Sequence, residues 1–341
     1  MNIYVLFGEF LSIMTPTEAV LAVTYRCNCR CTMCNIWQNA PEEEMEPVHY
    51  EKLPTSLRTI NITGGEPFLR KDLVDVLHAV HKRAQSARIV FSTNGLKTDT
   101  IVSVMSEVHR FHHRVGVGIS IDGLAETHDK TRGVEGTFRK AIATIEELRR
   151  AGVTDLRVGM TFTRDNISEA KDVFDLSKRL GVQFTATFAH NSEIYFQKTD
   201  NPAPEESKFC PDSLNAVIRA ELRSRSPKDW LRAYHMRGIM DSDLRREFIS
   251  HCEAGSTFFF MSPSGNVFPC SVMNLLVGNL QTVEAWDDLF KDGMGDRVAK
   301  AVRGCRSDCW MVCNTRSLIM AHPFKATSWI AVHKASAHLR R

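Results

Sequence analysis

Residues 20–37 read VLAVTYRCNCRCTMCNIW, an apolar run typical of a buried strand that leads directly into four clustered cysteines. Three of them, Cys27, Cys31 and Cys34, have the spacing C-x3-C-x2-C. Three thiolates can hold three irons of a cubane cluster and leave the fourth iron open to an exchangeable ligand. Zinc is the alternative, but zinc knuckles pair two short cysteine loops or add histidine, and no such partner lies nearby. The stretch therefore predicts an iron–sulfur site at the end of a strand, with Cys29 as an extra thiol and not a ligand.

From residue 19 to about residue 190, short β-branched runs alternate with helical patterns that end in turn signals such as Ala151-Gly152 and Leu180-Gly181. Six such units in series predict an α/β fold, a partial (β/α)6 TIM-like barrel, and an open doubly wound sheet is the alternative. The expected strands are residues 20–25, 59–63, 88–92, 115–121, 155–163 and 183–188, and the expected helices include residues 71–84, 136–151 and 167–180.

Composition narrows the class of protein. The 341 residues carry a net charge of +3, so nothing favours a nucleic-acid partner. Ten cysteines are many, and nine of them fall in two groups, between Cys27 and Cys34 and between Cys252 and Cys313. The first 14 residues lack the basic flank of a signal peptide, and no run is long enough to span a membrane. We therefore expect a cytoplasmic protein whose clustered cysteines bind metal rather than form disulfides.

Polar residues and glycines follow three of the expected strands. In a βα barrel the loops after the strands form the active-site face, so these positions are candidates for ligand binding. Two glycines would let the backbone approach a ligand closely, and the acid beside them supplies an acceptor. Each motif alone is also typical of an ordinary turn. The candidates are Gly64, Gly65, Glu66, Pro67, Ser92, Asn94, Ser120 and Asp122.

Together these motifs resemble the radical S-adenosylmethionine (SAM) superfamily, whose signature is C-x3-C-x-Φ-C, with Met33 at the apolar position. The resemblance implies that a [4Fe–4S] cluster with one open iron chelates SAM and cleaves it to methionine and a 5′-deoxyadenosyl radical. It implies that the segment 64–67 contacts the amino group of SAM, and that Ser92, Asn94, Ser120 and Asp122 line its ribose and carboxylate pocket. Arg132 would clamp a carboxylate, with a surface arginine as the alternative. A reductant such as flavodoxin or ferredoxin is implied as a partner.

The second group of cysteines suggests another cluster. Zinc is again an alternative, because two remote cysteine groups can form a tetrahedral site. The pattern C-x12-G-x4-C with later cysteines is similar to the SPASM and twitch extensions of the superfamily, which house auxiliary [4Fe–4S] clusters. The chain has too few cysteines for two clusters, so the resemblance implies one. Its ligands would be Cys252 and Cys270, then Cys309 and Cys305, with Cys313 able to replace either.

The expected organisation has five parts. They are an N-terminal extension (1–18), the partial barrel (19–200), a helical bridge (201–250), a SPASM/twitch-like auxiliary cluster domain (251–315) and a basic helical tail (316–341). The tail has basic residues and no acid, so an amphipathic helix on a membrane is an alternative to a solvated terminal helix.

The resemblance predicts an enzyme that abstracts hydrogen from a substrate, and the SPASM-like extension favours a peptide. The alternatives are modification of a sugar, lipid or cofactor precursor, as in the molybdopterin-precursor cyclase, a non-catalytic iron–sulfur protein, or a zinc-dependent nucleic-acid-binding module. The segment 64–67 argues against a mere electron carrier, and the small net charge against a nucleic-acid-binding module. No catalytic acid or base is identified, because many polar residues lie at strand ends.

Overall fold

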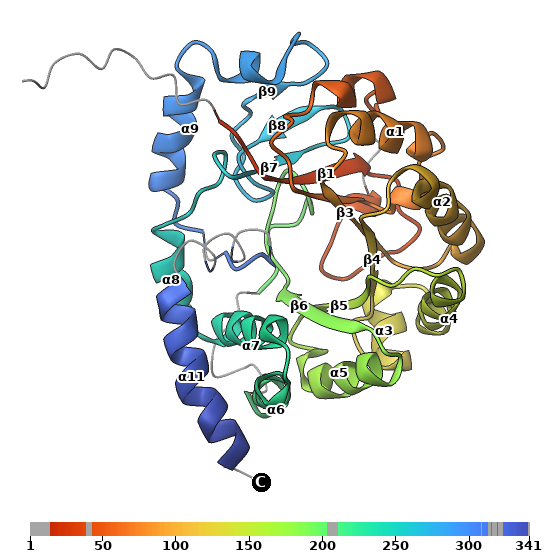
Figure 1. The fold of residues 1–341 in the computed structure, drawn as a ribbon, viewed down its shortest axis with the longest axis vertical. Coiled ribbons are helices and arrows are strands. Elements are labelled where there is room, and N and C mark those ends of the chain that lie inside the picture. Colours follow the sequence, from red (N-terminus) through yellow and green to blue (C-terminus); the bar gives the residue numbers. More distant parts are fainter. Residues whose placement is uncertain are drawn as a thin grey trace, which may run out of the picture.

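The computed structural model describes residues 14–38, 43–202, 211–307, 309–312, 315, 319 and 323–339. Six parallel strands curl into a partial barrel (Figure 1), and each matches an expected strand to within two residues at either end. They are β1 (Glu18–Thr24), β2 (Thr59–Gly64), β3 (Arg88–Thr93), β4 (Val115–Ser120), β5 (Leu156–Phe162) and β6 (Gln183–Phe188).

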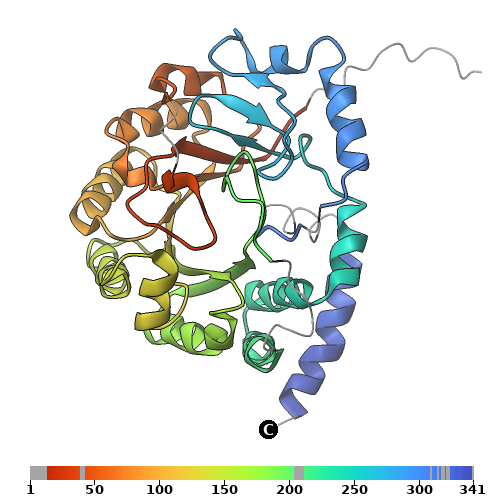
Figure 2. The same ribbon diagram turned by 180° about the vertical axis from the view of Figure 1, so that it is seen from behind.

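Helices cover the outer face of this curved sheet, as Figures 1 and 2 show from opposite sides. A doubly wound sheet would carry helices on both faces, so the barrel is the correct prediction. The helices are α1 (Leu73–Arg83), α2 (Thr98–Phe111), α3 (Ala125–Arg132), α4 (Thr137–Arg150) and α5 (Ala170–Arg179). Short 3-10 turns lie at η1 (Ile36–Gln38), η2 (Pro47–Lys52), η3 (Pro67–Leu69), η4 (Ile167–Glu169) and η5 (Trp286–Phe290).

Strand β1 occupies the middle of a longer sheet. The strand order is β6-β5-β4-β3-β2-β1-β7-β8-β9. Strand β7 (Phe258–Met261) pairs with β1 in parallel, and β8 (Asn266–Phe268) and β9 (Gly278–Asn279) follow in antiparallel order. Strands β7 to β9 therefore extend the barrel sheet itself.

The helical bridge consists of α6 (Pro211–Arg223), α7 (Pro227–Met240) and α8 (Ser242–Ile249), and α9 (Met294–Arg303) follows the β7–β9 region. Helix α11 (Pro323–Leu339) packs along α6 and α7. The boundaries of the five expected parts stay predictions.

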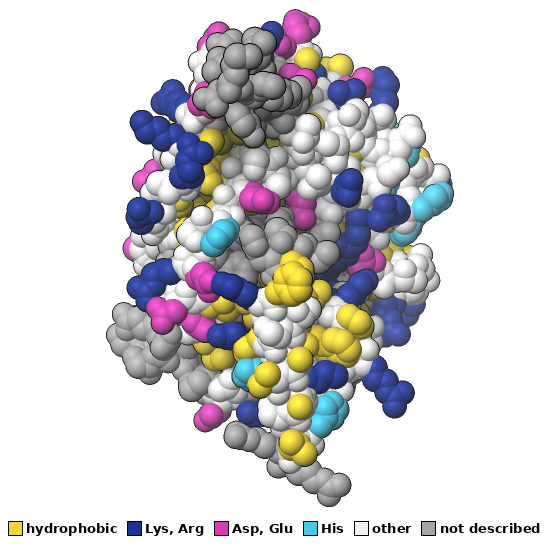
Figure 3. Space-filling model, turned by 60° about the vertical axis from the view of Figure 1, so that its left-hand side comes forward, with side chains coloured by type: hydrophobic (Ala, Val, Ile, Leu, Met, Phe, Trp, Pro, Cys, Tyr) yellow, Lys and Arg dark blue, Asp and Glu magenta, His cyan; other side chains and the backbone are white. Residues whose placement is uncertain are grey.

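Helix α11 turns its described lysines toward the protein. Lys334 Nζ donates to the carbonyls of Leu222 and Ser224 at 2.7 and 2.8 Å, and Lys325 pairs with Glu247. Hydrophobic side chains gather on its outer surface (Figure 3), where Phe324 is 86% exposed. No helix among the described residues is long and apolar enough to cross a membrane. Contact of the tail with a membrane surface stays a prediction.

Candidate active site at the cysteine loop

The cysteine loop, residues 25–35, leaves β1 at the carboxyl edge of the parallel strands and is held by the turn after β2. The N–H of Gly65 donates to the carbonyl of Thr24 at 2.7 Å. A Cβ on Gly64 would lie 2.0 Å from Thr24 O, and a Cβ on Gly65 would lie 2.3 Å from Arg26 O. Gly64 also has a φ of 142°, a conformation that other residues rarely adopt. These glycines therefore allow the cysteine loop itself to approach, whereas the sequence suggested that they admit a ligand.

Glu66 lies buried behind the glycines and fixes this turn to the end of β3. Its carboxylate accepts hydrogen bonds from Thr93 Oγ1 at 2.8 Å and from the N–H of Asn94 at 2.7 Å. Asn94 in turn donates through Nδ2 to Asn28 Oδ1 in the cysteine loop, at 2.7 Å. Burial raises the pKa of Glu66 to about 7, against the lowering effect of these hydrogen bonds. Two of the predicted motifs thus meet at the cysteine loop.

A buried ion pair connects the turn after β4 to the same loop. Arg132 Nη2 lies 2.6 Å from Asp122 Oδ2, and neither side chain is more than 11% exposed. Arg132 Nη1 also donates to Cys31 Sγ at 3.6 Å, and the N–H of Thr161 donates to Asp122 Oδ1 at 2.8 Å. Burial raises the pKa of Asp122, which Arg132 counteracts. Arg132 is therefore not a surface arginine, because its side chain is nearly buried and lies beside Cys31.

The two candidate serines lie at strand ends but farther from these contacts. Ser92 Oγ donates to Asn61 Oδ1 at 3.2 Å, between β3 and β2. Ser120 is the last residue of β4 and is half-buried. Pro67 begins the turn η3 directly after Glu66. The contacts of these three residues with a ligand stay predictions.

Cys27, Cys31 and Cys34 are half-buried thiols outside any disulfide. The neighbouring Cys29 thiol lowers the pKa of Cys31 through a hydrogen bond, and Arg132 acts in the same direction. Burial raises the pKa of Cys27 to about 11 and that of Cys34 to about 12. Because cysteine ligands of a metal must be thiolates, assembly of a cluster on this loop would release protons.

The donor set fits a cubane cluster. In the described part of the chain, no three Cys, His, Asp or Glu side chains converge as they would on one metal ion. A cubane places each thiolate on a different iron, so its ligands stand apart around the cluster. Three thiols on one short loop, with a buried arginine beside one of them, fit that arrangement.

A segment that the sequence analysis did not single out lies across the cysteine loop. Residues 189–201 follow β6, and within them Tyr195 is buried, with its hydroxyl 2.6 Å from Thr63 Oγ1 at the end of β2. The carbonyl of Phe196 accepts from the N–H of Asn35 at 2.9 Å. The sequence signal was the adjacent aromatic pair Tyr195-Phe196 in an otherwise polar stretch.

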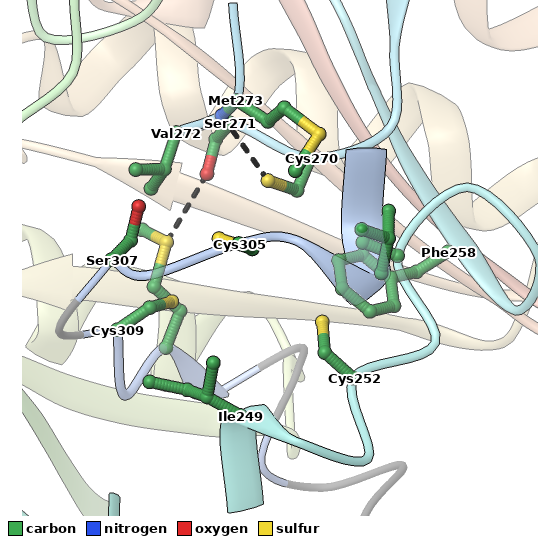
Figure 4. Close-up of a pocket in the computed structure, with 13 residues that line it drawn as sticks. Ile249, Cys252, Phe258, Cys270, Ser271, Val272, Met273, Cys305, Ser307 and Cys309 are labelled. Carbon is green, nitrogen blue, oxygen red and sulfur yellow. Dashed lines mark hydrogen bonds between the residues drawn. The ribbon is translucent and has the colours of Figure 1, made fainter. Parts of the chain in front are cut away.

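The C-terminal cysteines form a second site, the auxiliary pocket (Figure 4). Four of them line one pocket whose other walls are mostly apolar, including Phe258 and Val302. The pocket encloses about 480 Å³ of empty space, part of it open solvent. Burial raises the pKa of Cys270 to about 11, so a bound metal would again displace a proton. Four thiols in apolar surroundings fit a fully ligated cubane. They are Cys252, Cys270, Cys305 and Cys309.

A hairpin and an irregular segment carry these cysteines. The β7–β8 hairpin returns Cys270 toward Cys252. Helix α9 ends at Arg303, so Cys305 and Cys309 lie in irregular chain beyond it and do not share a helix face, although their four-residue spacing would allow one. Cys313 lies outside the described residues.

Trp310 anchors the segment next to Cys309. Its indole is fully buried and donates to the carbonyl of His235 at 2.7 Å, and its backbone N–H donates to His190 Nε2 at 3.0 Å. Gly238 makes room for the ring, since a Cβ there would lie 2.0 Å from it. The auxiliary pocket is therefore attached to α7 and to the end of the barrel.

Comparison with known proteins agrees with this geometry. Residues 21–176 match the model of the radical SAM superfamily. The AdoMet-dependent heme synthase of Methanosarcina barkeri is 29% identical over 81% of this chain and 84% of its own length. The mycofactocin maturase MftC of Mycolicibacterium smegmatis is 26% identical over 83% and 74%, respectively. The crystal structure of Streptococcus suis SuiB bound to S-adenosylmethionine superposes with a TM-score of 0.63 at 15% identity, covering 85% of this chain and 68% of SuiB.

The matched region contains the cysteine loop, both glycines, Glu66 and the Asp122–Arg132 pair. The two relatives match more than four fifths of the chain, well beyond residues 21–176, in agreement with a SPASM- or twitch-type extension. Residues 21–176 therefore form a radical SAM domain, and the chain is an enzyme that uses S-adenosylmethionine and [4Fe–4S] chemistry.

Proposed function

We propose that this enzyme modifies a peptide substrate by hydrogen abstraction, using a SAM-binding cluster on the cysteine loop and one auxiliary cluster. When bound, the first cluster supplies the reductive cleavage of SAM that yields the abstracting 5′-deoxyadenosyl radical. The observation that carries the proposal is the meeting of the cysteine loop with Gly65, Asn94 and Arg132. The resemblance of the chain to a maturase supports a peptide substrate.

The chain's own residues position these groups. We assign Cys27, Cys31 and Cys34 as the ligands of the first cluster. Gly64, Gly65 and Pro67 shape the turn that holds the cysteine loop, and Glu66 keeps that turn against β3. We assign the ligands of the auxiliary cluster as Cys252, Cys270, Cys305 and Cys309.

We expect Arg132 to bind the carboxylate of SAM through its guanidinium, which also pairs with Asp122. Asn94, Ser92 and Ser120 lie at neighbouring strand ends, where we expect the ribose to bind. Because Arg132 is nearly buried, the bound carboxylate would be shielded from water, which strengthens the ion pair.

The first cluster is tested by a pair of cysteine variants from one loop. Cys31→Ala should abolish 5′-deoxyadenosine formation in dithionite-reduced enzyme, because it removes a ligand, whereas Cys29→Ser should retain it. Chromatography and mass spectrometry measure the product. SAM cleavage by Cys31→Ala at the wild-type rate would rule out the ligand role.

The auxiliary cluster is tested by iron content. Cys270→Ala should lose about four irons per chain, one cubane, while keeping the signal of the first cluster. Cys29→Ser is again the matched control and should keep its iron. Equal iron in Cys270→Ala and wild type would remove the auxiliary assignment.

The substrate class is tested by deuterium transfer. A peptide labelled with deuterium at the attacked carbon should place deuterium in 5′-deoxyadenosine. The heme synthase relative suggests an iron porphyrin as a second candidate. A porphyrin that shifts its Soret band on binding and is converted, with no transfer from peptides, would favour that second candidate.

A further inference from the structure

Helix α9 has two contrasting sides. Val298 and Val302 are buried, whereas Arg297, Lys300 and Arg303 are exposed at three-residue spacing. Arg306, just beyond the helix, is exposed as well. We call these four cations the basic face of α9; Asp296 and Asp308 are the acids beside them in the sequence, which leaves a charge of +2 over residues 296–308. Among the described residues, no salt bridge engages Arg297, Lys300 or Arg303.

The opposite side of the same helix forms part of the auxiliary pocket. Val302 and Cys305 both line the pocket. A Cβ on Gly255 would lie 2.5 Å from Val298 Cγ1, so the helix packs tightly onto the segment between Cys252 and β7. Arg306 Nη1 donates to the carbonyl of Cys305 at 3.1 Å. A single short helix thus separates the cysteines from a basic surface, and it lies at the outer edge of the molecule (Figure 1).

We infer that the basic face of α9 is a docking surface for an acidic one-electron carrier protein that serves the auxiliary cluster. This inference rests on the auxiliary site proposed above. Electrons move efficiently only over short distances, so a carrier must approach the surface nearest the cluster. Electron-transfer encounters use small interfaces, and opposite charges raise their association rates. The exposed cations beside Cys305 meet both requirements.

The exchange moves one electron and no atoms. A flavodoxin hydroquinone gives up one electron and becomes the semiquinone, while the oxidised cluster gains that electron. The carrier then dissociates, which a weak electrostatic interface permits.

Binding is tested with oxidised flavodoxin and the complete, anaerobically reconstituted enzyme, by calorimetry at rising salt. The variant is Lys300→Glu/Arg303→Glu, and the control is Arg110→Glu/Lys140→Glu on α2 and α4, which makes the same change in net charge on the other side of the molecule. The α9 variant should bind at least about tenfold more weakly at low salt, with the difference vanishing near about 0.5 M. Equal affinities for the two double variants would overturn the inference.

An acidic peptide is the competing occupant of this face. If the α9 variant loses binding of a polyglutamate peptide but keeps flavodoxin affinity, the face binds peptide and the inference is wrong. Dithionite-driven SAM cleavage should be unchanged in both double variants, because this small reductant needs no docking surface. Absent cleavage in the wild type would instead refute the proposed function, while the flavodoxin affinities would still decide the docking.

Discussion

Replacement of Gly65 by alanine should loosen the cysteine loop. The added Cβ would lie 2.3 Å from Arg26 O and 2.8 Å from Tyr25 O, closer than real Cβ contacts occur. The two backbones must therefore separate, and the hydrogen bond from Glu66 N to Arg26 O, now 2.8 Å, would lengthen with them. Overpacking of this kind costs typically about 1–3 kcal/mol.

Gly295→Ala in α9 is the matched control, because nothing lies within 4 Å of the added Cβ. An alanine there should be neutral or stabilising by up to about 1 kcal/mol, since alanine favours helices. Urea unfolding under anaerobic conditions measures both variants, and iron analysis shows whether Gly65→Ala also loses the first cluster. If Gly65→Ala unfolded at the same midpoint as Gly295→Ala, the close approach would not matter and the reasoning would fail.

Three further predictions concern buried side chains. Burial raises the pKa of Glu221 from 4.5 to about 7, so the folded protein keeps a proton that the unfolded chain loses. The free energy of unfolding should therefore fall as the pH rises between these two values. At pH 8, urea titrations should show that Glu221→Gln raises the free energy of unfolding by roughly 3 kcal/mol. Gly238→Ala should displace Trp310 and lower auxiliary iron content, detectable as altered tryptophan fluorescence; unchanged spectra would contradict it. Asp122→Ala should leave Arg132 buried without its counter-charge and lower the free energy of unfolding by about 3–5 kcal/mol. Calorimetry should also show weaker SAM binding. If stability and SAM binding were both unchanged, the ion pair would have no role.

The repeating strand–helix part of the fold could be predicted from the local sequence pattern. Strands β1 to β6 are short runs rich in apolar residues, and the turn signals that bound them lie close by in the sequence. Pairing of β7 with β1 was not accessible, because Phe258 and Glu18 lie far apart in the chain and local pattern carries no information on such a pairing.

The candidate site was predictable in identity but not in geometry. The cysteine spacing and the segment 64–67 carry a recognisable pattern, whereas the burial of Arg132 depends on how α3 returns to the cysteine loop. The position of Cys309 depends on Trp310 filling the space left by Gly238, a contact between distant segments. Tyr195 was missed for the same reason, since its partner Thr63 belongs to another strand.

The parallel pairing of β7 with β1 has a practical consequence for dissecting the enzyme. A fragment ending at residue 250 would lack β7, so β1, the strand that carries the cysteine loop, would become an edge strand. Its unpaired backbone N–H and C=O groups would then favour self-association. Residues 258–261 thus support the strand that carries the cysteine loop, although they lie more than two hundred positions downstream of that loop. The two halves of this enzyme should accordingly be purified and studied as one piece.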